Sequence, residues 1–257
     1  MPYSPCCAGT SSAPRRTRPG SPVVVHRFAQ SGRIEWIALV FLQRYFEAMH
    51  GHAWQDVHDD HRPDIRDVDF HLDGVSADLK ADTYFADLRG ETRAATRYRK
   101  RDSGCLALET VSTDFSHRWQ NDRAPDPAQP RMSLGWMHTS RAEQIWYYFL
   151  ALDNAPDELD ALTGEGARQQ GAEVNREQRL LDTALVHRDE LLILPAAPLK
   201  AWFWANLDHF DRRGARNPAY TTWFRRVPRS VLLKENLVAR RIPNLAQEVL
   251  AWHRGCG

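Results

Sequence analysis

The sequence predicts an α/β fold in which helices flank a mixed central β-sheet. Apolar residues recur at helical spacing over residues 33–49, which indicates an amphipathic helix. Residues 68–72, 75–84 and 105–112 have the alternating or apolar patterns that are typical of strands. A wholly apolar run at residues 191–194 ends at Pro195 and is typical of a buried central strand. With a further helix expected after the third strand, the predicted order is α-β-β-β-α-β.

A chain of 257 residues is long enough for one large domain. Its 42% hydrophobic and 26% charged residues are ordinary for globular proteins, which excludes collagen-like, coiled-coil and largely disordered classes. Residues 1–22 are rich in Pro, Ser, Gly and Arg, so we expect a disordered basic tail. Residues 23–257 are expected to form a single domain, with a core at about 33–194 and a helical C-terminal extension at about 195–257.

The formal net charge of +1 argues against a uniformly basic surface but allows local basic patches. The four cysteines lack the paired spacing of a zinc ribbon, and no apolar stretch approaches the roughly 18 residues of a membrane-spanning helix. We therefore expect a soluble cytoplasmic protein that does not bind membranes. Arginines gather in the tail, in the loop before residue 105, and toward the C-terminus at Arg212, Arg213, Arg216, Arg225, Arg226, Arg229, Arg240 and Arg241.

The first helix carries one acidic residue of interest. Glu35 lies at intervals of four, seven and eleven residues before Leu39, Leu42 and Phe46, so it shares their face of the helix. A carboxylate on an apolar face needs a partner. Glu35 either lies in the first turn, where the helix dipole favours a negative charge, or reaches a functional site from the helix.

Charged residues alternate along the strand at residues 75–84, which follows a predicted Asp73-Gly74 hairpin turn. Asp78, Lys80 and Asp82 would share one face, because strand side chains alternate sides. The next strand carries Glu109 beside apolar residues, which indicates that it is largely buried. The simpler interpretation is the solvated face of an edge strand whose charges form cross-strand ion pairs.

Two carboxylates and a lysine on neighbouring strands suit a Mg²⁺ or Mn²⁺ site for phosphodiester cleavage. Oxygen ligands bind the ion, while an ammonium group steadies the attacking water or the developing charge. A basic loop joins the two strands and could contact phosphates near the cut through Arg97, Arg99, Lys100 and Arg101.

A helix is expected from Ser140, because Ser140 and Glu143 have the spacing of a capping box and an apolar face follows. Gln144 and Tyr148 would share a face of this helix. Tyr148 is either a nucleic-acid contact or an ordinary core residue. Residues 153–180 are polar and helix-prone, and residues 199–210 are expected to form an aromatic-rich helix.

The element order, with acids on the second and third strands, resembles the PD-(D/E)xK nuclease superfamily, also called the restriction-endonuclease-like fold, over residues 33–194. The resemblance implies that Asp82, Glu109 and Glu35 bind the metal. The family has a lysine two residues after the second acid, but this chain has Val111 there. The resemblance therefore implies that Lys80, on the preceding strand, takes the place of that lysine. Gln144 and Tyr148 are similar to a Gln-xxx-Tyr element of some branches. The sequence is also similar to uncharacterised phage-associated nuclease-like proteins at residues 80–83, 108–112 and 135–136.

The resemblance implies a metal-dependent nuclease, with DNA as the expected partner and substrate and internal cutting as the expected mode. One alternative is a catalytically inactive protein that keeps the nuclease fold and binds nucleic acid. Whether the chain forms a homodimer stays open. Another alternative is an unrelated metal-dependent hydrolase that uses a polar segment with His50, His52, His58, Asp59, Asp60, His61 and Asp64.

Overall fold

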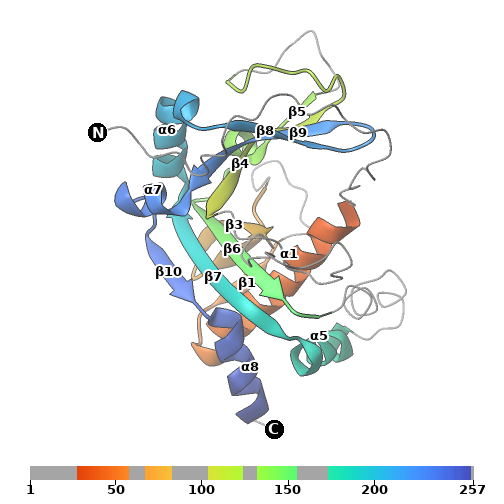
Figure 1. The fold of residues 1–257 in the computed structure, drawn as a ribbon. Coiled ribbons are helices and arrows are strands. Elements are labelled where there is room, and N and C mark those ends of the chain that lie inside the picture. The colour runs from red at the N-terminus through yellow and green to blue at the C-terminus, as the bar shows by residue number, and fades with distance from the viewer. Residues whose placement is uncertain (1–27, 58–66, 83–103, 124–131, 155–172, 256–257) are drawn as a thin grey trace.

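A computed structural model of the chain describes residues 28–57, 67–82, 104–123, 132–154 and 173–255, and shows two β-sheets with helices around them (Figure 1). The larger sheet has six strands in the order β1-β2-β3-β6-β7-β10, and the smaller has four in the order β5-β4-β9-β8. Strands β3 and β6 are parallel, whereas the other pairs of neighbours are antiparallel. The prediction of a mixed α/β fold with a mixed central sheet flanked by helices is therefore confirmed.

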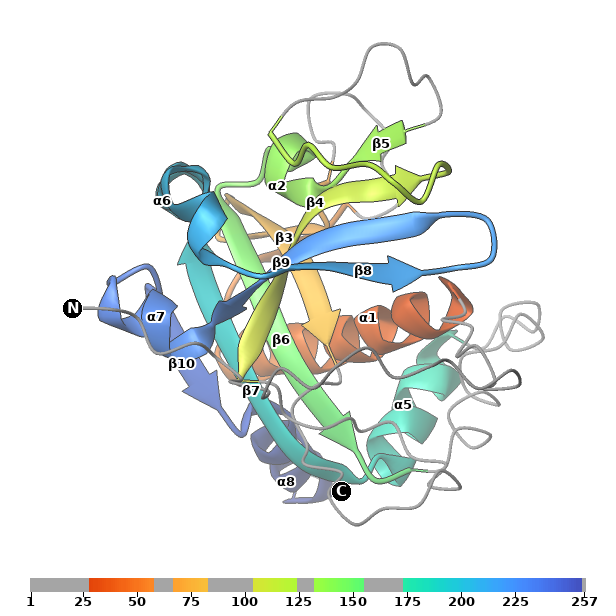
Figure 2. The same ribbon diagram turned by 45° about the horizontal axis from the view of Figure 1, so that its top comes forward.

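The larger sheet is formed by β1 (Trp54–Asp56), β2 (Phe70–Leu72), β3 (Val75–Asp82), β6 (Gln144–Leu152), β7 (Val186–Pro195) and β10 (Arg240–Pro243). The smaller sheet is formed by β4 (Cys105–Asp114), β5 (Met132–Leu134), β8 (Arg212–Arg216) and β9 (Thr221–Pro228). Figure 2 shows β4, β8 and β9 lying across β6 and β7. The smaller sheet thus covers one face of the larger one.

Helices cover both faces of the larger sheet. On one face, α1 (Phe28–Gln43), which continues as the π-helix η1 (Arg44–Met49), packs with α5 (Glu173–Thr183) and α8 (Leu245–Gly255) into the first core. On the other face, the second core joins β4 to α2 (Trp136–Thr139), α6 (Ala196–Asn206), the 3₁₀-helix η3 (Leu207–His209) and α7 (Arg229–Lys234). Within the described ranges, no helix is both long and apolar enough to cross a membrane.

The first helix and the hairpin after it follow the sequence prediction. Ile37 and Phe41 are fully buried in the first core, as their helical spacing requires. Asp73 and Gly74 both have positive φ values, 51° and 83°, which is the backbone of a type I′ turn. This turn sets the antiparallel register of β2 and β3, in which Leu72 pairs with Val75.

The predicted helix from Ser140 is wrong, because residues 144–152 form strand β6. This strand lies between β3 and β7, and both its faces are covered, so all its residues after Gln144 are buried. A continuous apolar run contains every helical spacing as well as every strand spacing, and periodicity therefore does not distinguish the two.

The prediction that the strand at residues 105–112 neighbours the strand at residues 75–84 is also wrong. Strands β2 and β3 are antiparallel neighbours, but β4 leaves the larger sheet and pairs with β9 and β5 instead. The C-terminal extension is not purely helical, since it supplies β8 and β9 to the smaller sheet and β10 to the larger one. The narrower prediction of a restriction-endonuclease-like core stays a prediction.

Candidate functional site

The alternating charges of β3 point toward the second core. In the parallel pairing with β6, Asp78, Lys80 and Asp82 lie opposite Ile145, Tyr147 and Phe149, which all belong to that core. Directly paired residues of a sheet share a face. The three charged side chains therefore face the smaller sheet, as the alternation predicts.

This face is not the solvated face of an edge strand. Strand β3 lies inside the sheet between β2 and β6, and only 1% of the Asp78 side chain is exposed. Lys80 keeps 27% of its side chain exposed and so can meet solvent or a ligand. The edge-strand interpretation is therefore wrong.

Lys80 lies among carboxylates. Its Nζ is 2.5 Å from Oδ1 of Asp78 and 5.9 Å from the centre of the Trp136 ring. Burial alone would lower the pKa of Lys80, but the negative charges of Asp78, then Asp69 and Glu35, outweigh it and raise the pKa. Lys80 is thus a cation at every pH near neutrality.

Asp78 and Asp69 bring two carboxylates to the same region. Burial raises the pKa of Asp78, Lys80 opposes this shift, and the charge of Asp69 adds to it. Asp69 is held just before β2, where its Oδ2 accepts a hydrogen bond of 2.5 Å from the backbone N–H of Leu79. Sequence analysis missed Asp69, because an acid in an alternating strand pattern usually faces solvent.

Glu109 approaches from the other sheet. Burial raises its pKa, while the charge of Lys80 and a hydrogen bond from Ser112 lower it and the charges of Asp78 and Asp67 raise it. The register of β4 shifts immediately after Glu109, which marks a β-bulge. Glu109 and Lys80 thus interact electrostatically from different sheets rather than from neighbouring strands of one sheet.

Val111, two residues after Glu109, is fully buried on the opposite side of that bulge, where it pairs with Trp223. A lysine there would have to bury its charge without a partner, which is costly. The charge of Lys80 on β3 lowers the pKa of Glu109, and its role as a migrated lysine stays a prediction.

Asp82 lies on the same face but has a different neighbour. Its Oδ2 accepts a hydrogen bond of 3.1 Å from the hydroxyl of Tyr147, which itself accepts one of 3.0 Å from the backbone N–H of Ala107. The charges that act on Glu109 include that of Asp78. Asp78 therefore interacts electrostatically with Glu109, and the role of Asp82 as a metal ligand stays a prediction. Sequence analysis missed Tyr147, because it lies in a continuous apolar run that gives no sign of a functional residue.

Glu35 is the eighth residue of α1, beyond its first turn, so the helix-dipole interpretation is wrong. Its charge contributes to the raised pKa of Lys80. We call Lys80 and the carboxylates coupled to it, Glu35, Asp69, Asp78 and Glu109, the Lys80 cluster.

A second lysine that sequence analysis missed reaches this region from α6. Lys200 donates a hydrogen bond from Nζ to the backbone oxygen of Ser140. Burial lowers its pKa, and the charges of Asp78 and Asp67 partly restore it. The position of Lys200 follows from the packing of α6 onto the second core. The aromatic-rich pattern of this helix did not predict which sheet face α6 would cover.

The predicted nucleic-acid contacts have three different outcomes in the structure. Tyr148 is fully buried, and its hydroxyl donates a hydrogen bond of 2.9 Å to Oδ2 of Asp189, so the prediction that it contacts nucleic acid is wrong. Gln144 accepts a hydrogen bond of 2.8 Å from Nε1 of Trp146 at the start of the same strand. The basic-loop residues Arg97, Arg99, Lys100 and Arg101 lie outside the described residues, as do the predicted tail and His58, Asp59, Asp60, His61 and Asp64.

Carboxylate oxygens are the ligands that Mg²⁺ and Mn²⁺ prefer, so the donor set of the Lys80 cluster suits these ions in kind. As the side chains stand, no three His, Cys, Asp or Glu residues in the described part of the chain gather closely enough to hold a metal ion. The alternative histidine site receives no support from its described members, since Nδ1 of His52 lies 2.6 Å from Asp73 and the ring of His50 packs on Tyr45.

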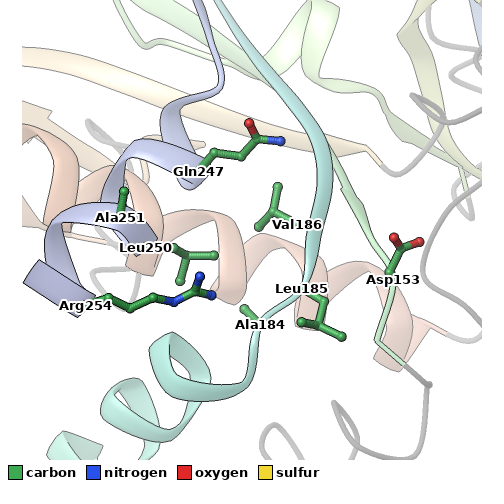
Figure 3. Close-up of a pocket in the computed structure, with 8 residues that line it drawn as sticks. All are labelled: Asp153, Ala184, Leu185, Val186, Gln247, Leu250, Ala251 and Arg254. Carbon is green, nitrogen blue, oxygen red and sulfur yellow. The ribbon is translucent and has the colours of Figure 1, made fainter.

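A cavity of about 420 Å³ lies elsewhere, at the far end of β6 and β7 beside α8 (Figure 3). Its walls are mostly aliphatic, with Asp153 and Arg254 at its rim. It shares no residue with the Lys80 cluster, which lies where β4 crosses β3 and β6. No family model, curated protein or solved structure matched the chain.

Proposed function

We propose that the protein is a metal-dependent nuclease that hydrolyses phosphodiester bonds, with DNA as the expected substrate. The observation that supports this proposal most strongly is the Lys80 cluster, in which one partly exposed ammonium between two sheets contacts Asp78 and interacts electrostatically with three further carboxylates. Lys200 adds a second positive charge at one side, and the region still keeps a surplus of negative charge.

This surplus favours binding of a cation. Carboxylates that are packed together and withdrawn from water destabilise each other unless a positive charge joins them. The raised pKa values of Asp78 and Glu109 report this strain. A divalent ion would relieve it, and the bound residues would then be carboxylates at neutral pH.

Each residue has a role in the proposed reaction. Asp78 and Glu109 would hold the metal, with Glu35 and Asp82 acting through water or through neighbouring groups. The metal would supply a hydroxide-like water and offset the charge of the scissile phosphate. Lys80 would orient the attacking water and donate hydrogen bonds to the phosphate oxygens, since its pKa keeps it charged.

The decisive experiment is cleavage of single- and double-stranded DNA and RNA with Mg²⁺, Mn²⁺ or EDTA. We expect metal-dependent cutting that falls by roughly a hundredfold or more in Lys80→Met, Asp78→Asn and Glu109→Gln, the usual effect of removing a group that stabilises the transition state. Asp208→Asn is the matched control, because Asp208 is an exposed acid 3.3 Å from Arg123.

Binding of Mn²⁺, measured by calorimetry, separates the roles of these residues. Lys80→Met should keep metal binding, whereas Asp78→Asn and Glu109→Gln should lose it. Asp82→Asn should weaken cleavage only about 10- to 100-fold, as expected for a residue that acts through Tyr147. Cutting that persists in EDTA, or in all three central variants, would overturn the proposal. A folded wild type that binds nucleic acid without cutting any substrate would favour the inactive alternative.

A further inference from the structure

The smaller sheet carries basic and aromatic residues on the same face as Glu109. In the pairing of β4 with β9, Glu109 lies opposite Phe224, and Ala107 lies opposite Arg226. In the pairing of β9 with β8, Phe224 lies opposite Arg213. Because paired residues share a face, Glu109, Phe224 and Arg213 form one row across three strands, and Arg226 lies beside it. We call these four residues the Glu109 face.

The opposite face of the same hairpin is occupied by internal contacts. Arg225 and Arg212 bind the buried carboxylate of Asp122, at 2.8 Å and 2.9 Å from their Nε atoms. Nε1 of Trp223 donates a hydrogen bond of 2.9 Å to Asp114. Arg216 also belongs to this face, since it pairs with Thr221, but it is exposed. The hairpin thus uses one face for its own stability.

Arg213, Phe224 and Arg226 of the Glu109 face reach solvent, whereas Glu109 is largely withdrawn from it. The side chain of Arg213 is 53% exposed, and Phe224 and Arg226 are partly exposed. Tyr220 adjoins the same region, because the charge of Glu109, after burial, contributes to raising its pKa. Its ring packs on the exposed Phe115, with 6.1 Å between ring centres. In Figure 2 the β8–β9 hairpin extends outward beyond the larger sheet.

We propose that the Glu109 face is the surface on which a single nucleic-acid strand lies as it enters the Lys80 cluster. This inference rests on the proposed function and names its substrate as single-stranded. Arg212, Arg225 and Arg229 pair with buried carboxylates, whereas Arg213 and Arg226 lie on the Glu109 face, where their positive charge suits a polyanion. Arg213 and Arg226 would bind phosphates, and Phe224 would stack on an unpaired base, which a duplex does not offer.

The test is binding of a fluorescein-labelled 20-nucleotide single strand, measured by anisotropy in EDTA at several KCl concentrations. Arg213→Gln and Arg226→Gln should each weaken binding and lower the slope of log affinity against log salt by roughly 0.7. Arg216→Gln is the matched control, because it removes the same charge from the same strand on the opposite face. It should leave both quantities nearly unchanged.

Two further variants test the stacking and the charge. Phe224→Leu should weaken single-strand binding roughly fivefold to a hundredfold and leave the salt slope unchanged. Asp211→Asn should strengthen binding, since Asp211 Oδ2 lies 2.9 Å from Nη2 of Arg213 and competes with a phosphate. Circular dichroism and thermal unfolding confirm that each variant is folded.

The outcomes separate this inference from the proposed function. Equal losses in Arg213→Gln and Arg216→Gln, tighter binding of a duplex than of the single strand, or no binding at all would overturn the Glu109 face as the strand-binding surface. Cleavage that persists in that case would leave the nuclease proposal standing. Binding with the expected pattern but no metal-dependent cutting would overturn the nuclease proposal and leave the surface in place.

Discussion

A Cβ atom at Gly135 would lie 2.5 Å from the backbone oxygen of Glu109 and 2.8 Å from its Cγ atom. The backbone N–H of Gly135 donates a hydrogen bond of 2.9 Å to the carbonyl of Thr110. Helix α2 can begin this close to β4 only because no side chain stands between them. Since α2 also supplies Trp136 beside Lys80, this contact joins both halves of the Lys80 cluster.

Gly135→Ala should lower the free energy of unfolding by about 1–3 kcal/mol, because the added methyl group meets backbone atoms that have no free space to move into. Urea unfolding measures the loss. Gly255→Ala is the control, since a Cβ there meets nothing within 4 Å. Equal stability of the two variants would show that α2 and β4 separate at little cost.

At this scale, the sequence correctly placed Asp78, Lys80 and Asp82 on one face of β3, but it did not show that Asp78 is almost fully buried. Alternation tells which residues share a face of a strand, but not how deeply each lies in the sheet. The depth of Asp78 comes from β6 and the smaller sheet, which pack over its end of β3. The positions of Lys200 and Tyr147 depend on the same packing, so no local sequence pattern predicts them.

At the scale of elements, one buried carboxylate holds the β8–β9 hairpin to the rest of the smaller sheet. The side chain of Asp122 is fully buried and binds Arg212 and Arg225 as well as the hydroxyl of Thr110. The guanidinium of Arg212 also stacks on Trp223, with 3.8 Å to the ring centre. Arg212 and Arg225 of one hairpin therefore share the single carboxylate of Asp122, which lies in the segment after β4.

Asp122→Asn should cost about 3 kcal/mol or more of stability, because it leaves two nearly buried guanidinium groups without their counter-charge. Hydrogen exchange should speed up selectively in β8 and β9. Asp211→Asn breaks a pair that is 53% and 71% exposed, so it should cost less than about 1 kcal/mol. A uniform rise in exchange over both sheets would contradict this anchoring role.

Local patterns predicted those elements whose signals are local. The helix at residues 33–49, the Asp73-Gly74 turn, and the strands at 105–112 and 191–194 were each visible from periodicity or turn chemistry. Strand β6 was not, because both of its faces are buried. Strand β9 was not, because its arginines pair with a distant aspartate rather than face water.

At the scale of the whole molecule, Asp189 links the larger sheet to α8. Its side chain is buried, and its Oδ2 accepts hydrogen bonds from the hydroxyl of Tyr148 and the backbone N–H of Ala246, at 2.9 Å and 2.8 Å. Burial raises the pKa of Asp189 to about 6, although these hydrogen bonds oppose the shift. The folded state therefore takes up a proton more readily than the unfolded state does.

This difference makes stability depend on pH. Between the unfolded pKa of about 4 and the folded pKa of about 6, ionisation of Asp189 progressively destabilises the fold as the pH rises. The penalty is absent below pH 4 and complete above pH 6, where it reaches on the order of 3 kcal/mol. Asp189→Asn should therefore gain stability relative to wild type across this window. Urea unfolding at pH 4, 5, 6 and 7 checks this, with Asp208→Asn as control; a constant difference would contradict it.

The second sheet was beyond sequence analysis for a physical reason. Its central pairing joins β4 to β9, and pairing between segments so far apart depends on the packing of everything between them. The same distance explains why β4 was wrongly predicted to neighbour β3. Strand β4 had two suitable partners, and only the complete fold selects β9 over the larger sheet.

The pairing of Glu109 with Phe224 also imposes an order of events during synthesis. Glu109 leaves the ribosome more than a hundred residues before its partner strand, so β4 has no neighbour on that side while the intervening chain is being made. The larger sheet is likewise incomplete until β10, which pairs with β7, has been synthesised. A chain whose translation is arrested before residue 228 would hold Lys80 and Glu109 without the framework that brings them together.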